Sequence, residues 1–127
     1  MKKVCVIDFD DTICNPARPW PAMGTPKKGA RTALQKIRDM GFEIHILSCR
    51  TDSSVYKYPI DRQEQVRKME AYLDENEIPY DVVLNKDKPV AHVYIDDRGI
   101  GFRDNWEDVA QSYGLKYWGQ WKYAALL

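Results

Sequence analysis

The segment Val4-Cys5-Val6-Ile7-Asp8-Phe9-Asp10-Asp11-Thr12 decides the fold class of this chain of 127 residues. Its first four residues form a continuous apolar run, rich in β-branched side chains, that ends abruptly in acidic residues. Runs of this kind are typical of a strand buried on both faces, as in the middle of a parallel sheet. We therefore expect a central strand over residues 4–7, with acidic groups at its carboxyl end.

Strand and helix patterns alternate outward from this segment. Apolar residues at helical spacing predict helices over residues 30–40, 61–76 and about 106–113. Short apolar runs predict strands over residues 43–47, 80–84, 92–95 and 115–118. Residues 13–28 hold four of the seven prolines and are expected to form a loop. This alternation predicts an α/β fold, a three-layer sandwich around a mainly parallel, five-stranded, Rossmann-like sheet.

The composition indicates one soluble domain over residues 1–127, since a chain of this size has room for one core. Nineteen basic residues balance nineteen acidic ones, so the net charge provides no general attraction for nucleic acid or membranes. The three cysteines show no CxxC spacing, which argues against a disulfide framework or a zinc site. No apolar run reaches the length of a signal peptide or a membrane span. We expect a cytoplasmic protein that does not bind membranes.

Polar residues follow four of the predicted strands directly. They are residues 8–12, 48–50, 85–88 and 96–98, and they include acids, a hydroxyl group and basic groups. In parallel sheets of this class, ligands bind at the carboxyl ends of the strands. The sequence therefore predicts that the functional site lies at this edge of the sheet.

Two acidic pairs at these strand ends point to a metal ion. Asp8 with Asp10 and Asp96 with Asp97 would repel each other in one cleft unless a cation were present. Oxygen ligands without histidine or cysteine suit a hard ion, and Mg²⁺ commonly takes one or two carboxylates. The alternative is that the acids only terminate strands, because aspartate favours turns. Both pairs together favour a magnesium site.

The same edge carries the groups needed for phosphoryl transfer. A carboxylate can attack phosphorus and form an aspartyl-phosphate, and a second acid, Asp10, can protonate the leaving oxygen. The phosphoryl oxygens then need donors and cations, which Ser48 and either Lys86 or Lys88 could supply. Taken singly, Ser48 could be a turn residue and each lysine a solvated loop residue.

The ordered set of these motifs resembles the haloacid dehalogenase superfamily. Val6-Ile7-Asp8-Phe9-Asp10-Asp11-Thr12 is similar to its hhhDxDx(T/V) signature, and Leu47-Ser48 is similar to its second motif. The Lys86/Lys88 segment resembles the third motif, and Ile95-Asp96-Asp97 resembles the fourth. The resemblance implies a Mg²⁺-dependent phosphatase with a fold of the haloacid dehalogenase type, in which Asp8 is the nucleophile and a metal ligand.

The resemblance assigns the other roles residue by residue. It implies that Asp10 is the general acid/base, with its backbone carbonyl on Mg²⁺, and that Asp97 is a direct metal ligand with Asp96 close behind. It implies that Ser48 and the lysine hold the transferred phosphoryl group, and that Thr12 belongs to the substrate-binding groups.

A closer similarity concerns Ser48-Cys49-Arg50 and Ile95-Asp96-Asp97-Arg98. This layout is similar to the phosphatase domain of polynucleotide kinase-phosphatases and to cap-less phosphatases of phage and bacteria. It implies that Arg50 contacts a substrate phosphate, where the guanidinium fork is well suited. The alternative is a loop arginine that pairs with Asp52. A nucleic-acid 3′-phosphatase is accordingly the second candidate function.

The short segment Asn85–Val90 bears on the choice of lysine. Six residues between two parallel strands leave no room for a helix, so the third strand is short or the connection is stretched. Lys86 lies just past the third strand, which favours it, whereas Lys88-Pro89 looks more like the usual Lys-Pro of the family. No insertion is long enough for a cap domain, so we expect an open site for a phosphorylated small molecule or a nucleic-acid end.

A signalling receiver domain is the candidate from another class. Receivers are also small α/β sandwiches that use aspartate, serine or threonine, lysine and Mg²⁺. They carry the acidic pair after the first strand and the phosphorylated aspartate after the third. Here Asp8 and Asp10 follow the first strand and no lone aspartate follows the third, which favours the phosphatase.

Overall fold

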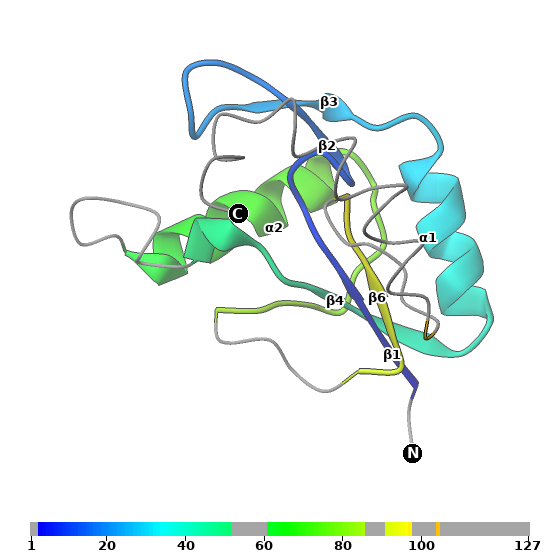
Figure 1. The fold of residues 1–127 in the computed structure, drawn as a ribbon. Coiled ribbons are helices and arrows are strands. Elements are labelled where there is room, and N and C mark those ends of the chain that lie inside the picture. Colours follow the sequence, from blue (N-terminus) through cyan, green and yellow to red (C-terminus); the bar gives the residue numbers. More distant parts are fainter. Residues whose placement is uncertain (1–2, 52–60, 86–90, 98–103, 105–127) are drawn as a thin grey trace. The chain divides into compact units, whose positions relative to one another are not determined.

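The computed structural model of the protein describes residues 3–51, 61–85, 91–97 and 104 (Figure 1). The chain divides into two compact units, Met1–Asp97 and Arg98–Leu127, and all elements described below belong to the first. The helix expected near 106–113 and the strand expected at 115–118 lie outside the described residues. A single domain over residues 1–127 stays a prediction.

A parallel sheet of four strands forms the centre of the first unit. Its members are β1 (Lys3–Ile7), β4 (Phe42–Ile46), β5 (Val82–Val83) and β6 (Val93–Ile95), in the order β5-β4-β1-β6. Each neighbouring pair is parallel, with Ile7 opposite both Ile46 and Ile95. The prediction of a mainly parallel α/β fold is confirmed, and four strands of the sheet lie within the described residues.

Two helices form where helical spacing predicted them, and one end of each has a local cause. Helix α1 (Ala30–Asp39) ends just before Gly41, whose φ of 93° is a conformation that glycine adopts without strain. Helix α2 (Arg62–Glu75) begins at Asp61, whose carboxylate accepts hydrogen bonds from the backbone N–H groups of Gln63 and Glu64.

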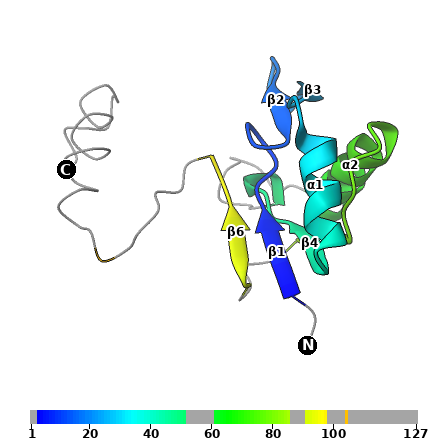
Figure 2. The same ribbon diagram turned by 90° about the vertical axis from the view of Figure 1, so that its right-hand side faces the viewer.

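Both helices pack against the same face of the sheet, as Figure 2 shows. The side chains on this face come from alternate residues of β1 and β4, and they form one buried cluster with residues of the two helices: Cys5, Ile7, Ile44, Ile46, Leu34, Val66, Met69 and Leu73. The crossovers from β1 to β4 and from β4 to β5 run in one direction across the sheet. Right-handed crossovers in one direction place their helices on one face.

Residues 13–28 are not the simple loop that their prolines predicted. They contain an antiparallel hairpin of β2 (Cys14–Pro16) and β3 (Met23–Pro26). Proline is compatible with such short edge strands because few of their N–H groups pair. Gly24 lets the two strands approach closely, since a Cβ atom there would lie 2.3 Å from the backbone oxygen of Asn15. The loop prediction was therefore wrong for these seven residues.

The third strand of the parallel sheet is shorter than its apolar run predicted. Only Val82 and Val83 pair with β4, instead of residues 80–84. β5 and β6 lie at opposite edges of the described sheet, with β4 and β1 between them. A short third strand is one of the two outcomes that the six-residue spacing left open, and residues 86–90, which bear on the other, lie outside the described residues. None of the helices among the described residues is both long and apolar enough to cross a membrane.

Candidate active site

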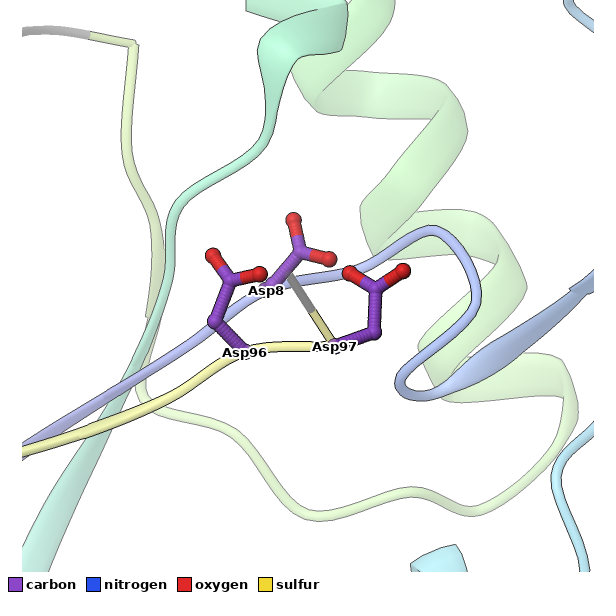
Figure 3. A group of neighbouring side chains, drawn as sticks. All are labelled: Asp8, Asp96 and Asp97. Atoms are coloured by element: carbon purple, nitrogen blue, oxygen red, sulfur yellow. The ribbon is translucent and has the colours of Figure 1, made fainter. Parts of the chain in front are cut away.

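Three carboxylates from two neighbouring strands meet at the carboxyl edge of the sheet. Asp8 directly follows β1, and Asp96 and Asp97 directly follow β6, which is paired with β1 (Figure 3). The backbone N–H of Asp8 donates to the carbonyl of Ile95 at 2.9 Å, so the pairing continues to the last residue before the acids. One carboxylate oxygen from each residue lies within 4.8 Å of the others.

The cluster changes the electrostatics of Asp8. Burial raises the pKa of this carboxyl to about 7, together with hydrogen bonding to Asp97 and the nearby charges of Asp96 and Asp97. The hydroxyl of Thr12 donates to Asp8 Oδ2 at 3.2 Å, which acts in the opposite direction. The Asp8 carboxyl therefore resists ionisation where no cation is present.

A tight turn after β1 places the next residues of the motif. The backbone N–H groups of Ile13 and Cys14 donate to the carbonyl of Phe9 at 2.9 and 3.0 Å, and Asp11 has a φ of 61°. Phe9 is fully buried against Tyr72, with an edge-to-face ring contact of 5.3 Å. The buried ring anchors the turn that carries Asp8, Asp10 and Thr12. Thr12, expected to bind substrate, binds Asp8 in this structure.

Ser48 comes two residues after β4, the strand that pairs with β1. The backbone N–H of Leu47 donates to the carbonyl of Ile7 at 3.0 Å, which sets the start of the Ser48 loop next to Asp8. The Ser48 side chain is buried, and its Oγ accepts a hydrogen bond from the backbone N–H of Arg50 at 3.1 Å. The chain then forms the short 3₁₀ turn η1 (Cys49–Thr51).

Arg50 pairs with a residue that the sequence analysis did not name as its partner. Its guanidinium is 1% exposed and forms a two-pronged ion pair with the carboxylate of Asp10. In this structure its donors serve Asp10 and backbone carbonyls, and the expected contact with a substrate phosphate stays a prediction. Asp52, the alternative partner, lies outside the described residues.

The Asp10 carboxylate stands apart from the three-carboxylate group. Among the described residues, that group holds Asp8, Asp96 and Asp97 and leaves out Asp10, whose oxygens accept from Arg50 at 2.7–3.2 Å. This separation is compatible with the role that the resemblance implied, in which Asp10 offers its backbone carbonyl to a metal and its side chain to proton transfer. Lys86 and Lys88 lie outside the described residues.

Sequence reasoning missed the part of the β2–β3 hairpin that encloses Arg50. The carbonyl of Pro21 accepts from Arg50 Nη1 at 2.6 Å, and the Trp20 ring lies 4.3 Å from the guanidinium carbon. One signal could have found the Asp10–Arg50 pair. Each residue comes a few positions after one of two neighbouring parallel strands. Their side chains therefore start close together at the same edge of the sheet, where an acidic and a basic group can pair.

The three clustered carboxylates fit a magnesium ion. Ligand oxygens around an octahedral Mg²⁺ at ~2.1 Å lie about 3 to 4 Å apart, so small side-chain rotations of Asp8, Asp96 and Asp97 would suffice. An ion there would also offset the loss of solvation of Asp8 and its repulsion by Asp96 and Asp97. A cluster of acids alone does not identify a metal, and the ion stays a prediction.

Comparison with known proteins bears on the fold. No protein-family model matches this sequence, and no curated protein matches it. A solved structure of a conserved protein from Bacteroides thetaiotaomicron superposes with a TM-score of 0.50 and 20% sequence identity, over 91% of this chain and 93% of that one. At this identity, the similarity supports a shared α/β fold with a mainly parallel sheet and carries no statement about activity.

Proposed function

We propose that this protein is a Mg²⁺-dependent phosphohydrolase of the haloacid dehalogenase type that acts through an aspartyl-phosphate on Asp8. One observation carries the proposal. The carboxylates of Asp8, Asp96 and Asp97 gather within 4.8 Å at the carboxyl edge of two adjacent parallel strands. That edge is where α/β sheets bind their ligands, and like charges that crowd around the partly buried Asp8 favour a cation.

In the first proposed step, a carboxylate oxygen of Asp8 attacks the phosphorus atom of a phosphomonoester. The Asp8 O–P bond forms and the bond from phosphorus to the leaving oxygen breaks, while Asp10 donates a proton to that oxygen. In the second step, a water molecule attacks the same phosphorus atom and Asp10 takes its proton. The Asp8 O–P bond breaks, and inorganic phosphate and the free carboxylate result.

Other residues stabilise the charge that moves in these steps. The proposed Mg²⁺, held by Asp8, Asp97 and Asp96, would neutralise negative charge on the phosphoryl oxygens. Ser48 comes two residues after β4, and the backbone pairing of Leu47 with Ile7 supports its hydroxyl as a further donor to this group. Lys86 is proposed as the cation that completes the set, with Lys88 as the alternative.

The order of the strands supports the phosphatase over the receiver domain. Counted in chain order, the four parallel strands lie as third-second-first-fourth across the sheet. That is the Rossmann-type order, whereas flavodoxin-like domains such as receivers place the second and third strands on either side of the first. The finer fold that goes with this proposal is a five-stranded, three-layer sandwich without a cap domain.

The proposed substrate is a phosphorylated small molecule. The nucleic-acid 3′-phosphatase was suggested by Arg50 as a phosphate contact, and the buried pairing of Arg50 with Asp10 removes that support. Net charge adds none, since nineteen basic and nineteen acidic residues balance. An oligonucleotide with a 3′-phosphate is therefore an informative comparison substrate rather than the expected one.

The proposal is tested by phosphatase assays with and without magnesium. We expect the protein to hydrolyse p-nitrophenyl phosphate with Mg²⁺ and to stop in EDTA. Asp8→Asn should lower the rate by on the order of 10³-fold or more, because the nucleophile is lost. Asp39→Asn, which changes a carboxylate on α1 that binds Gln35, is the matched control and should keep its activity. Activity retained in Asp8→Asn would contradict the covalent mechanism.

A further inference from the structure

We propose that Arg50 is a positioning residue that holds the Asp10 carboxylate for proton transfer, and that the turn of the β2–β3 hairpin holds Arg50 in place. The inference rests on the proposed function, because it assigns a task to a residue through Asp10. It replaces the sequence-based expectation that Arg50 binds the substrate phosphate itself.

The geometry of the pair restricts the side chain of Asp10. Arg50 Nε donates to Asp10 Oδ2 at 2.9 Å and Nη2 donates to Oδ1 at 2.7 Å. Two parallel bonds from a planar guanidinium fix both the direction and the plane of a carboxylate, which a single bond or a lysine cannot do. The pair therefore gives Asp10 one preferred orientation beside the turn that also carries Asp8.

The surroundings of Arg50 restrict it in turn. The Phe9 ring lies 5.5 Å from the guanidinium carbon and the Trp20 ring lies 4.3 Å from it. The carbonyls of Pro21 and Ala22 accept from Nη1 at 2.6 Å and from Nη2 at 3.4 Å. Backbone acceptors and aromatic faces together hold the charged group with almost no contact to water.

The two partners differ in exposure, and this difference indicates which of them a substrate can reach. The Arg50 side chain is 1% exposed, whereas the Asp10 side chain is 25% exposed. A phosphate in solution can therefore reach Asp10 without reaching Arg50. In this arrangement the arginine acts on the reaction through the carboxylate that it orients. The hairpin turn contributes indirectly, because it holds the arginine.

Leaving groups of different basicity separate this role from phosphate binding. An aryl phosphate releases a weakly basic oxygen that needs little help from an acid, whereas an alkyl phosphate releases a strongly basic one that must be protonated. A misplaced Asp10 should therefore harm the alkyl substrate more. A lost phosphate contact should harm both substrates alike and should raise KM.

The experiment compares Arg50→Gln, Asp10→Asn and the double variant on p-nitrophenyl phosphate and a simple alkyl phosphate, each with Mg²⁺. We expect Arg50→Gln to lower kcat on the alkyl phosphate at least about tenfold more than on the aryl phosphate, with KM changed less than about threefold. Adding Arg50→Gln to Asp10→Asn should cause less than about a twofold further loss. Arg31→Gln, which removes an exposed arginine paired with Glu77, is the control and should match the wild type.

Two results would overturn the inference. One is an equal rise in KM for both substrates in Arg50→Gln, which would assign Arg50 to the phosphate. The other is a double variant whose fold-loss in kcat equals the product of the fold-losses of the two single variants, which would show that the residues act independently. Should Arg50→Gln not fold, Trp20→Leu removes the stacked ring and keeps both charges, and it should reproduce the preference for the aryl substrate more weakly.

Failure of the proposed function would look different. In that case the wild type would hydrolyse neither substrate, at any magnesium concentration, and Asp8→Asn would change nothing. Thermal unfolding of the same four proteins still reports whether the ion pair exists, because paired residues give non-additive shifts of the melting temperature. Non-additive shifts of the melting temperature in proteins without activity would show that Arg50 and Asp10 interact and would overturn the catalytic role of the pair.

Discussion

At the scale of the single residue, Asp8 combines two properties that oppose each other. Its carboxyl is partly buried next to two more acids, which raises its pKa to about 7. The proposed chemistry needs the ionised form as a nucleophile. A cation between the three carboxylates would resolve the conflict, because it favours the charged form that burial disfavours.

The raised pKa of Asp8 predicts how the stability of the metal-free protein depends on pH. The folded pKa of about 7 lies above the ordinary value of 3.8, so the folded state binds the proton more tightly. The stability from that proton is fully present below the ordinary pKa and is lost as the pH rises through about 7. We expect Asp8→Asn, which never ionises, to be the more stable protein at pH 8 by about 1–2 kcal/mol, since water partly screens the cluster.

Urea unfolding in EDTA at pH 8 and pH 5 measures this difference. The advantage of Asp8→Asn should be smaller at pH 5 than at pH 8, and Asp39→Asn should show no comparable trend. A wild type that is as stable at pH 8 as Asp8→Asn would mean that the three acids do not strain the folded state.

At the scale of the element, the hairpin of β2 and β3 supports the site although it contributes no proposed ligand. Its turn supplies the Pro21 carbonyl and the Trp20 ring that hold Arg50. Its strands are tied to helix α2, since the Tyr72 hydroxyl donates to the carbonyl of Gly24 at 2.8 Å. Changes in the hairpin should therefore affect both stability and activity.

Gly24→Ala is expected to open the hairpin. The added Cβ would lie 2.3 Å from the Asn15 oxygen and 3.0 Å from the Pro16 oxygen, and backbone atoms cannot rotate away. We expect a loss of about 1–3 kcal/mol in unfolding free energy and a lower kcat on alkyl phosphates. Thermal unfolding and the phosphatase assay measure both effects. Thr25→Ala, at an exposed position of the same strand, should change stability by less than about 0.5 kcal/mol.

The short third strand bears on the lysine of the proposed site. The backbone N–H of Leu84 still donates to the carbonyl of Ile46 at 2.8 Å, so the pairing with β4 continues to two positions before Lys86 in the sequence. We expect Lys86→Ala to lower kcat about 10²-fold or more, because a cation near the phosphoryl group is lost. Lys88→Ala should lower it less than about threefold. The reverse pattern would show that the Lys-Pro resemblance is the better guide.

At the scale of the whole molecule, the proposed site joins three segments that are far apart in sequence. Residues 8–12, 48–50 and 96–97 meet because their strands are parallel neighbours in the order β4-β1-β6. An ion bound by Asp8 and Asp97 would link β1 to β6, which is an exposed strand within the described residues. Metal binding should therefore stabilise the whole fold.

Magnesium is expected to raise the melting temperature of the wild type. An ion at tenfold its dissociation constant contributes about 1.4 kcal/mol, which corresponds to a shift of roughly 3–6 °C for a domain of this size. Asp97→Asn should lose most of that shift. Sodium chloride at matched ionic strength controls for general screening. An equal shift in both proteins, or none in the wild type, would contradict the proposed metal site.

The sequence by itself determined the parts of this protein that depend on neighbouring residues. Helices α1 and α2 follow from apolar spacing, from the start signal Asp61 and from the stop signal Gly41, and the parallel sheet follows from alternating strand and helix patterns. The meeting of Asp8 with Asp96 and Asp97 agrees with the same reasoning, because parallel strands share one carboxyl edge. Their function stays a prediction.

Only the tertiary structure decided which side chains pair across that edge. The sequence offered a substrate phosphate or Asp52 as the partner of Arg50, and the fold brings Asp10, Pro21 and Trp20 to it. It also turned part of a proline-rich loop into a hairpin and shortened the third strand to two residues. These outcomes depend on which of several distant segments makes the more favourable contacts. The apolar pattern within one segment does not specify which distant segment will pair with it.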